Sequence, residues 1–308
     1  MITILLAAYN GEKYIAEQIE SLLAQTVRDF KLYIHDDHST DGTYDIISAY
    51  AHENPELIIA QQNDYNTGGA KHNFMQMMIR YKDDYVMLCD QDDVWLPDKI
   101  QVTYDKMKET EAGYGAQTPL LVHTDLQVVD EELVTISPSY RYAMNSNYNN
   151  TSLRHQIIQN TCTGCTAMYN RALANLIAEA PPFMVMHDWW LMLTAAAFGR
   201  IAPIESQTVL YRQHRENEIG AGNVRTFCYK INKLLNYKEI KKALNDTYLQ
   251  TQSFLDVYRD KLSPEQNTFL AAYCDVPKHW KIFRLFRIVR LSVWKYGFSR
   301  KVATIFFI

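Results

Sequence analysis

The feature that most constrains the fold is a repeated alternation of short strand-like runs with amphipathic segments in the first third of the chain. Residues 2–8 (ITILLAA) form a continuous apolar run, and residues 30–35 (FKLYIH) form a second strand-like segment. Between them, apolar side chains recur at helical spacing over residues 15–23. A run that is apolar at every position favours a strand covered on both faces, as in a parallel sheet flanked by helices.

The same alternation continues along the chain. The pattern predicts helices over residues 44–52 and 71–81, and strands over residues 57–61, 84–89 and 120–125. Repeated βα units with short connections indicate an α/β fold built on a doubly wound, mostly parallel sheet.

The second half of the chain has a different pattern. Residues 189–198 are apolar and helix-like, and residues 226–274 are helical in pattern with weak breaks near Asn236 and Ser263. We therefore divide the 308 residues into an α/β domain over residues 1–222 and a helical C-terminal region over residues 223–308.

Three polar clusters share one position, because each comes just after a predicted strand. They are Tyr9-Asn10, Asp36-Asp37 and Asp90 to Asp93. Ligands of an open parallel sheet bind beyond the carboxyl ends of its strands, so the clusters predict a single site. The sequence has neither a Gly-x-Gly-x-x-Gly after the first strand nor a Walker A pattern. This argues against a dinucleotide-dependent oxidoreductase and against a P-loop protein.

The segment Asp90-Gln91-Asp92-Asp93 places three carboxylates within four residues. Like charges this close repel one another unless a cation or bound protons compensate them. Mg²⁺ or Mn²⁺ is the natural compensation, because these ions prefer oxygen ligands and share their shell with diphosphate oxygens. The alternative is a solvated acidic turn that caps the following helix.

Several segments carry a resemblance to a known family. YNGEKYIAEQIESLLAQT, IHDDHSTDGT and MLCDQDDVWLPDKI occur in this order, followed by HTDL, TGCTAMYNRAL, HDWW and LYRQHREN. Together they resemble the family 2 glycosyltransferases of GT-A fold over roughly residues 1–220. The detailed residues of these motifs are similar to those of the bacterial rhamnosyltransferase-like branch. The resemblance implies an enzyme that takes its sugar from a nucleoside diphosphate.

The resemblance implies a nucleotide site at the first two strand ends. Ala8, Tyr9 and Glu12 match positions that frame the nucleotide, and Asp37 matches the residue that accepts from the imide N–H of uracil or thymine, a favourable charge-assisted pair. Lys71 lies where relatives often place a cation near the nucleotide. A helix cap at the Asp36-Asp37 turn and a solvated helix lysine are the alternatives.

The resemblance also implies a metal-diphosphate site. Asp90 and Asp92 match the DXD motif, with Asp90 toward the donor ribose or sugar and Asp92 and the adjoining Asp93 toward Mg²⁺ or Mn²⁺. His214 matches a further metal or diphosphate ligand, and Arg212 a phosphate contact. A metal here would stabilise the negative charge of the departing nucleoside diphosphate.

Asp188 in the segment His187-Asp188-Trp189-Trp190 matches the general base of inverting relatives. Inversion requires a base on the face opposite the leaving phosphate, where it deprotonates the attacking hydroxyl. A carboxylate at the start of an apolar helix is also a common helix cap, and the two roles are compatible. Either tryptophan can stack on a sugar, and we expect one of the two to be in the core, with Trp189 taken as the acceptor contact.

The segment Cys162-Thr163-Gly164-Cys165 resembles an acceptor-side loop, so Thr163 and Gly164 are candidate acceptor contacts. With no second Cys pair and no matching His spacing for zinc, both thiols are interpreted as structural. His123 and Asp125 can face the donor sugar or form a buried polar pair.

Charge is unevenly distributed along the chain. No acidic residue follows Asp275, whereas eight of the 31 basic residues lie in residues 276–308; all 35 acidic residues come earlier. An acidic body argues against nucleic-acid binding. From residue 281 the tail combines an apolar stripe (Ile282, Leu285, Phe286, Val289, Val293) with cations, which favours a helix lying on an anionic membrane surface. The alternative is a helix that packs this stripe on the domain.

We therefore expect a metal-assisted, inverting glycosyltransferase that moves L-rhamnose from dTDP-L-rhamnose to a lipid-linked or polysaccharide acceptor. The rivals are a transferase using UDP-hexose or UDP-GalNAc, a nucleotidyltransferase, and a non-catalytic glycan-binding or membrane-docking relic. Five cysteines and the lack of a signal-peptide pattern suggest the cytoplasm, at the inner face of a bacterial cell membrane.

Overall fold

The computed structural model describes residues 1–214 and 237–308. The chain divides into two compact units. The sheet unit comprises Met1–Tyr140, Cys162–Ala180 and Gly199–Ala221, and the helical unit comprises Arg141–Thr161, Pro181–Phe198 and Gly222–Ile308. The boundary that the sequence predicts between residues 222 and 223 and the weak break near Asn236 fall outside the described residues, so both stay predictions.

The first third of the sheet unit follows the predicted alternation. Its elements are β1 (Ile2–Ala8), α1 (Ile15–Leu23), β2 (Phe30–Asp36), α2 (Thr43–Glu53), β3 (Ile58–Gln62), α3 (Ala70–Arg80) and β4 (Tyr85–Asp90). Every residue of β1 is buried, as expected for a strand covered on both faces. From β1 the chain adds β2 and then β3 on one side, and it then crosses back to add β4 on the other side of β1. Because such crossovers are right-handed, α1 and α2 lie on one face of the sheet and α3 lies on the other.

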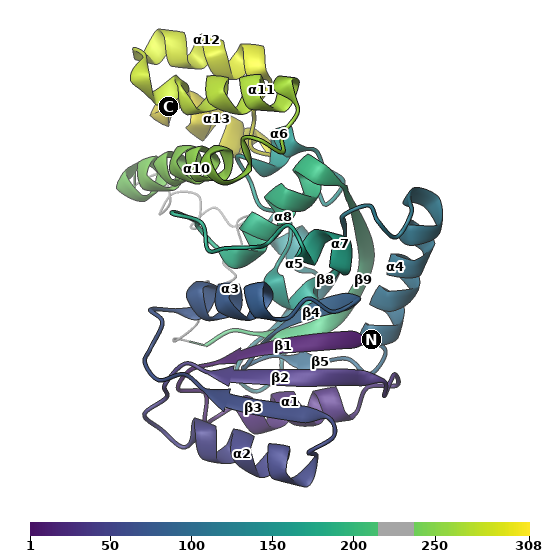
Figure 1. Cartoon of the computed structure of the whole chain (residues 1–308). Helices are drawn as coiled ribbons and strands as arrows, with labels where there is room; N and C mark the ends of the chain where they lie inside the picture. The colour runs from purple at the N-terminus through teal and green to yellow at the C-terminus, as the bar shows by residue number, and fades with distance from the viewer. Residues whose placement is uncertain (215–236) are drawn as a thin grey trace. The chain divides into compact units, whose positions relative to one another are not determined.

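The register of these strands brings their polar ends to one edge. The order is β3-β2-β1-β4, all parallel (Figure 1). Ala8 pairs with Asp36, and Ala7 pairs with Asp90. The chain reverses its direction of winding between β1 and β4, which is the place where ligands bind in such sheets. The predicted doubly wound α/β sheet is therefore confirmed.

The rest of the sheet is mixed and much of it was not predicted. Its elements are β5 (Val94–Trp95), α4 (Lys99–Tyr114), β6 (Leu120–Val129), β7 (Thr135–Ser137), the 3-10 turn η1 (Gly164–Thr166), β8 (Ala167–Asn170), α7 (Arg171–Ala174) and β9 (Arg200–Arg212). Short β8 runs antiparallel between β4 and β6, and β9 pairs with both β6 and β5. Within the described residues the sheet therefore has nine strands, and β9 ends beside the acidic segment that follows β4.

Close packing where β9 begins gives a stability prediction. A Cβ on Gly199 would lie 1.7 Å from the carbonyl oxygen of Pro119, which accepts a hydrogen bond from the Arg200 amide. We expect Gly199→Ala to lower the free energy of unfolding by about 2 kcal/mol or more, because backbone must move. Gly113→Ala is the control, since no atom lies within 4 Å of its Cβ and alanine favours the α4 helix. Equal urea midpoints for the two variants would contradict the prediction.

In the helical unit, α8 packs against α6 and α10. Its helices are α6 (Leu153–Gln156), α8 (His187–Phe198), α10 (Tyr237–Tyr258), α11 (Pro264–Cys274), α12 (Lys281–Leu291) and α13 (Phe298–Phe307), and it also contains the 3-10 turn η2 (Val276–Lys278). The short helix α5 (Tyr140–Ala143) spans the point in the sequence where the first segment of the sheet unit ends. The Trp190 ring packs 5.3 Å from that of Phe254, so this tryptophan is the core residue of its pair. Ser263 caps α11 in a capping box, which confirms the predicted break there. No helix among the described residues is long and apolar enough to cross a membrane.

Candidate functional site

The loop after β1 is held in place by the turn after β2. The Asn10 amide donates to Ser39 Oγ over 2.8 Å, and Asn10 Oδ1 accepts from the Thr40 amide. Glu12 Oε2 accepts from the Gly42 amide over 2.9 Å. Asn10 itself is in the left-handed region with φ 47°, which asparagine tolerates better than most residues. The loop that carries Tyr9 and Glu12 is thus fixed before any ligand arrives.

The two acids after β2 have different surroundings. Asp36 accepts from the Ser39 amide and hydroxyl and from Gln62, so the predicted turn-capping alternative holds for it. Asp37 is 2% exposed and accepts from Asn63 Nδ2 and from the amide and hydroxyl of Thr67, at 2.8–2.9 Å. Asp37 therefore anchors the loop that leads to α3, and its contact with the base stays a prediction.

Gln91 links the first strand end to the acidic segment, a role that the sequence did not reveal. Its Oε1 accepts from the Tyr9 amide over 2.8 Å, and its Nε2 donates to the Tyr9 carbonyl over 2.9 Å. A Cβ on Gly11 would lie 2.3 Å from Gln91 Oε1, so a larger residue there would displace the Gln91 side chain. This pair of hydrogen bonds sets the acidic segment against the predicted nucleotide loop.

The acidic segment forms a compact cluster rather than a helix cap, because β5 follows it and the N-cap of α4 is Asp98. Ligand atoms of Asp90, Asp93 and Cys165 lie within 4.8 Å of one another. Burial, with the carboxylates of Asp92 and Asp90, raises the pKa of Asp93 well above its usual range. Burial also raises the pKa of the Cys165 thiol, which is hydrogen-bonded to Asp93. Cys165, interpreted as structural from its sequence, thus supports an acidic residue.

Asp92 and His214 meet across 122 positions of sequence. His214 Nε2 lies 2.8 Å from Asp92 Oδ2, and the two side chains are 8% and 14% exposed. The His214 ring also packs 4.9 Å from the Tyr14 ring. The structure therefore brings together two residues for which the sequence predicts one metal site.

Arg212, which the sequence predicts to be a phosphate contact, is enclosed by protein groups. Its side chain is 3% exposed, and its guanidinium binds the carboxylate of Glu17 and the backbone carbonyls of Asp92 and Glu131. Its amide also donates to Asp93 Oδ1 over 3.2 Å. A guanidinium enclosed in this way fixes the Asp92-Asp93 backbone and has little surface left for a phosphate.

A buried lysine lies beneath the acidic cluster and was also missed. Lys99 is 0% exposed; its Nζ is 4.5 Å from the centre of the Trp95 ring and 3.5 Å from Thr208 Oγ1. Burial lowers the pKa of Lys99 to about 8, although Cys165, Cys89 and Asp93 oppose the change. A buried cation near Asp93 lowers the cost of ionising that carboxylate in the interior.

Other predicted positions are also located. His123 and Asp125 lie inside β6, not after a strand, and are at most 1% exposed. Burial lowers the pKa of His123 to about 4, and Asp125 Oδ2 accepts from Ser139 Oγ. The buried alternative therefore holds for this pair, because β6 extends to Val129 instead of ending at residue 125. Lys71 is in the first turn of α3 and is half-buried.

The predicted base and acceptor residues are divided between the units. Asp188 is in the first turn of α8 in the helical unit and is 8% exposed. Trp189 in the same turn donates from Nε1 to the carbonyl of Gln156 over 2.6 Å. Thr163 and Gly164 belong to the sheet unit at η1, where Gly164 is buried and Thr163 is half-buried.

A scan against protein families identifies the class. The model for glycosyl transferase family 2 matches residues 3–176, more than half of the chain, so this chain belongs to glycosyl transferase family 2 and is a nucleotide-sugar-dependent glycosyltransferase. The match covers β1 through α7, including both acidic strand ends. The family predicted from the sequence is therefore confirmed.

Individual curated proteins are similar in sequence to this chain. The chain is 28% identical over 233 residues to the dTDP-rhamnosyl transferase RfbG of Shigella flexneri, covering 70% of this chain and 74% of that protein. It spans 59% of the length of three uncharacterized mycobacterial relatives, at 29% identity.

Solved structures share the fold. The S. aureus TarS fragment 1–349 in complex with UDP-GlcNAc superposes with a TM-score of 0.57 at 16% identity, covering 99% of this chain and 90% of that chain. The Pyrobaculum calidifontis mannosyltransferase PcManGT, in complex with GDP-Man and Mn²⁺, superposes with a TM-score of 0.55 at 16% identity, covering 94% and 72%. These matches confirm the predicted GT-A fold.

Proposed function

We propose that this glycosyltransferase moves a sugar from a nucleoside diphosphate to an acceptor hydroxyl with inversion at the anomeric carbon. The observation that supports this best is the set of Asp90, Asp92, Asp93 and His214, gathered at the carboxyl edge of the sheet beside the Tyr9 loop. Such an edge is where an α/β sheet binds its ligand, and the first strand end frames the nucleotide.

The donor atoms suit Mg²⁺ or Mn²⁺. Carboxylate oxygens and an imidazole nitrogen are acceptable ligands for either ion. Asp90 and Asp92 are partly exposed, whereas Asp93 is buried. We therefore assign Asp92 and His214 as ligands of the ion and Asp90 as a contact of the donor sugar or ribose. Asp93 either binds the ion from the buried side or supports the residues that do. When bound, the ion would supply positive charge against the departing diphosphate.

The remaining residues bind and orient the reactants. Ala8, Tyr9 and Glu12 line the nucleotide loop, Asp37 accepts the imide N–H of the base, and Lys71 adds a cation. Arg212 holds the Asp92-Asp93 backbone, a positioning role in place of the phosphate contact. Thr163, Gly164 and Trp189 contact the acceptor.

Asp188 is proposed as the general base. It removes the proton from the acceptor hydroxyl as that oxygen attacks the anomeric carbon, while the bond from this carbon to the diphosphate oxygen breaks on the opposite face. One displacement inverts the configuration, so a β-linked rhamnose donor gives an α-linked product.

The proposed donor is dTDP-L-rhamnose, supported by the similarity to RfbG. The second candidate is a UDP-hexose or UDP-GalNAc donor, favoured by the fold shared with TarS, which was solved with UDP-GlcNAc. We propose a lipid-linked or polysaccharide acceptor at the cytoplasmic face of a bacterial membrane, where such precursors are built.

A donor panel tests this proposal. Purified protein is incubated with dTDP-L-rhamnose, UDP-glucose, UDP-GlcNAc or UDP-GalNAc in the presence of Mg²⁺ or Mn²⁺, and release of the nucleoside diphosphate is measured. We expect dTDP-L-rhamnose to be used at least about 10-fold faster than any UDP-sugar, because differences in several sugar hydroxyls and the base add to more than 1.4 kcal/mol. Faster turnover of a UDP-sugar would establish the second candidate, and no turnover of any donor would favour the relic.

A further inference from the structure

The C-terminal helices expose apolar side chains to an unusual degree. Half of the large apolar side chains that are exposed among the described residues lie between Trp280 and Phe306. They are Trp280, Ile282, Phe283, Phe286, Val289, Tyr296, Phe298, Ile305 and Phe306. Single exposed apolar residues are ordinary, but a concentration of this kind marks a surface that binds something.

Helix α12 is apolar on two faces, and only one of them is packed. Ile288, together with Val293 just beyond the helix, is fully buried and attaches α12 to the unit. Ile282, Phe286 and Val289 lie on another face and are 82%, 63% and 53% exposed. The apolar stripe that the sequence predicts is thus divided. Val293 is packed on the unit, as the packing alternative predicts, whereas Ile282, Phe286 and Val289 are exposed.

Cations lie at the margins of the exposed face. Lys281 and Arg290 are exposed, and Arg284 and Arg287 are half-buried. Arg287 forms an ion pair of 3.1 Å with Asp275, the last acidic residue of the chain. The exposed face therefore combines apolar side chains with the positive charge of Lys281 and Arg290.

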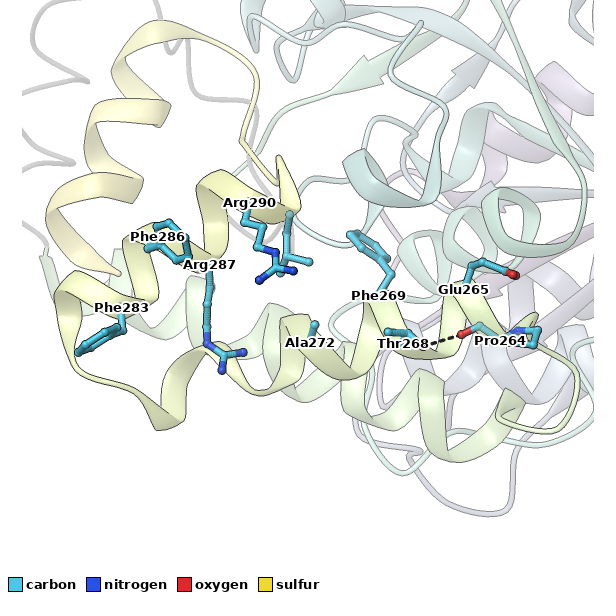
Figure 2. Close-up of a pocket in the computed structure, with 10 residues that line it drawn as sticks. Pro264, Glu265, Thr268, Phe269, Ala272, Phe283, Phe286, Arg287 and Arg290 are labelled. Atoms are coloured by element: carbon cyan, nitrogen blue, oxygen red, sulfur yellow. Dashed lines mark hydrogen bonds between the residues drawn. The ribbon is translucent and has the colours of Figure 1, made fainter.

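A groove of about 830 Å³ runs between α11 and α12. Figure 2 shows Phe269 and Ala272 on its α11 side and Phe283, Phe286, Arg287 and Arg290 on its α12 side. Glu265, also at the groove, is hydrogen-bonded to Ser263 over 2.8 Å at the start of α11. Figure 2 shows Arg290 between Phe286 and Phe269, whereas Arg287 is paired with Asp275. A guanidinium in this setting suits the phosphate of a lipid headgroup whose chains extend past the rings.

We propose that α12 docks the enzyme on an anionic membrane surface, with Ile282, Phe286 and Val289 in the headgroup region and Lys281 and Arg290 on lipid phosphates. An amphipathic helix with cations beside its apolar face binds such a surface through both contributions. A second copy of the chain is a poorer occupant, because no acidic residue follows Asp275 and a two-fold contact between α12 helices would set cations against cations. The proposal does not depend on the donor or on the catalytic residues.

Flotation with vesicles tests the docking surface. Full-length protein is mixed with vesicles of phosphatidylglycerol and phosphatidylethanolamine, or of phosphatidylcholine alone, and the bound fraction is measured. We expect binding to the anionic vesicles only, weakened at least about 100-fold in the Ile282→Asn/Phe286→Asn variant. The matched control is Val134→Asn/Ile136→Asn, which removes two side chains that are 62% and 56% exposed in the sheet unit and leaves binding unchanged.

Removal of the two exposed cations is a second test of the docking surface. Lys281→Gln/Arg290→Gln is expected to weaken binding to anionic vesicles roughly 25-fold, since each cation near the surface contributes about five-fold. Equal binding of the wild type and the Ile282→Asn/Phe286→Asn variant would overturn the proposal, as would absence of vesicle binding at physiological salt. A dimer that this variant dissociates, without vesicle binding by the wild type, would identify a second copy as the occupant. Unchanged melting temperatures show that the variants fold.

Discussion

Asp188→Asn is expected to lower kcat for sugar transfer by about 1000-fold, within the range that a positioned general base contributes. The amide keeps the shape of the carboxylate but does not take the acceptor proton, so donor binding survives while transfer is lost. The protein should stay folded, because asparagine has the size of aspartate and the lost attraction between the charge and the first turn of α8 is about 0.3–1 kcal/mol. Transfer is measured by product formation, and donor affinity by calorimetry.

The control for this prediction is another acidic residue in a first helical turn of the same unit. Glu239 lies in the first turn of α10 and is exposed. Glu239→Gln removes the same kind of helix interaction without touching the proposed base, and should leave kcat within about two-fold, since surface changes of this kind alter stability by at most about 0.5 kcal/mol. If Asp188→Asn transfers sugar at the wild-type rate, Asp188 is only a helix-terminal residue.

Local patterns explain why the parallel half of the sheet was predictable. A strand such as β1 is buried on both faces, so its sequence is apolar throughout, and its carboxyl end must turn polar where it meets solvent and ligand. The same rule placed Asp36 and Asp90 at one edge before any pairing was known, and the register confirms it. Periodicity and turn residues together were sufficient there.

Long-range pairing explains what the sequence did not show. The side chains of Gln91, Arg212 and Cys165 are polar or small, and only the folded sheet reveals that they hold Tyr9, the Asp92-Asp93 backbone and the Asp93 carboxyl. Likewise, β8 is four residues long, too short for its alternation to be distinguished from that of a loop. These contacts depend on strands that come together from distant parts of the chain.

The two faces of α12 illustrate a different limit. Angular position on a helix predicts which side chains share a face, but not which face the rest of the protein covers. Ile288 lies outside the predicted apolar stripe, yet it is fully buried. The side of α12 that carries Ile288 is therefore packed on the unit, whereas Ile282, Phe286 and Val289 of the predicted stripe are exposed.

Asp92→Asn, or removal of divalent metal with EDTA, is expected to reduce kcat/KM by about 1000-fold, because a bound ion stabilises the leaving diphosphate by several kcal/mol. Mg²⁺ or Mn²⁺ should restore the chelated wild type but not the variant. Asp92 is assigned to the ion with His214, 2.8 Å away, so His214→Gln should weaken Mn²⁺ binding as well.

A readout other than turnover makes the metal prediction independent of the acceptor. Mn²⁺ binding in the presence of the nucleoside diphosphate is followed by electron paramagnetic resonance, and Asp92→Asn should weaken it at least about 10-fold, since a charged ligand is lost. Asp98→Asn is the control, because Asp98 is an exposed carboxylate six residues further on, where it makes no side-chain hydrogen bond to cap α4. Turnover that persists in EDTA, together with unaltered Mn²⁺ binding by Asp92→Asn, would show that the acidic cluster is structural and that Lys71 or another cation neutralises the leaving group.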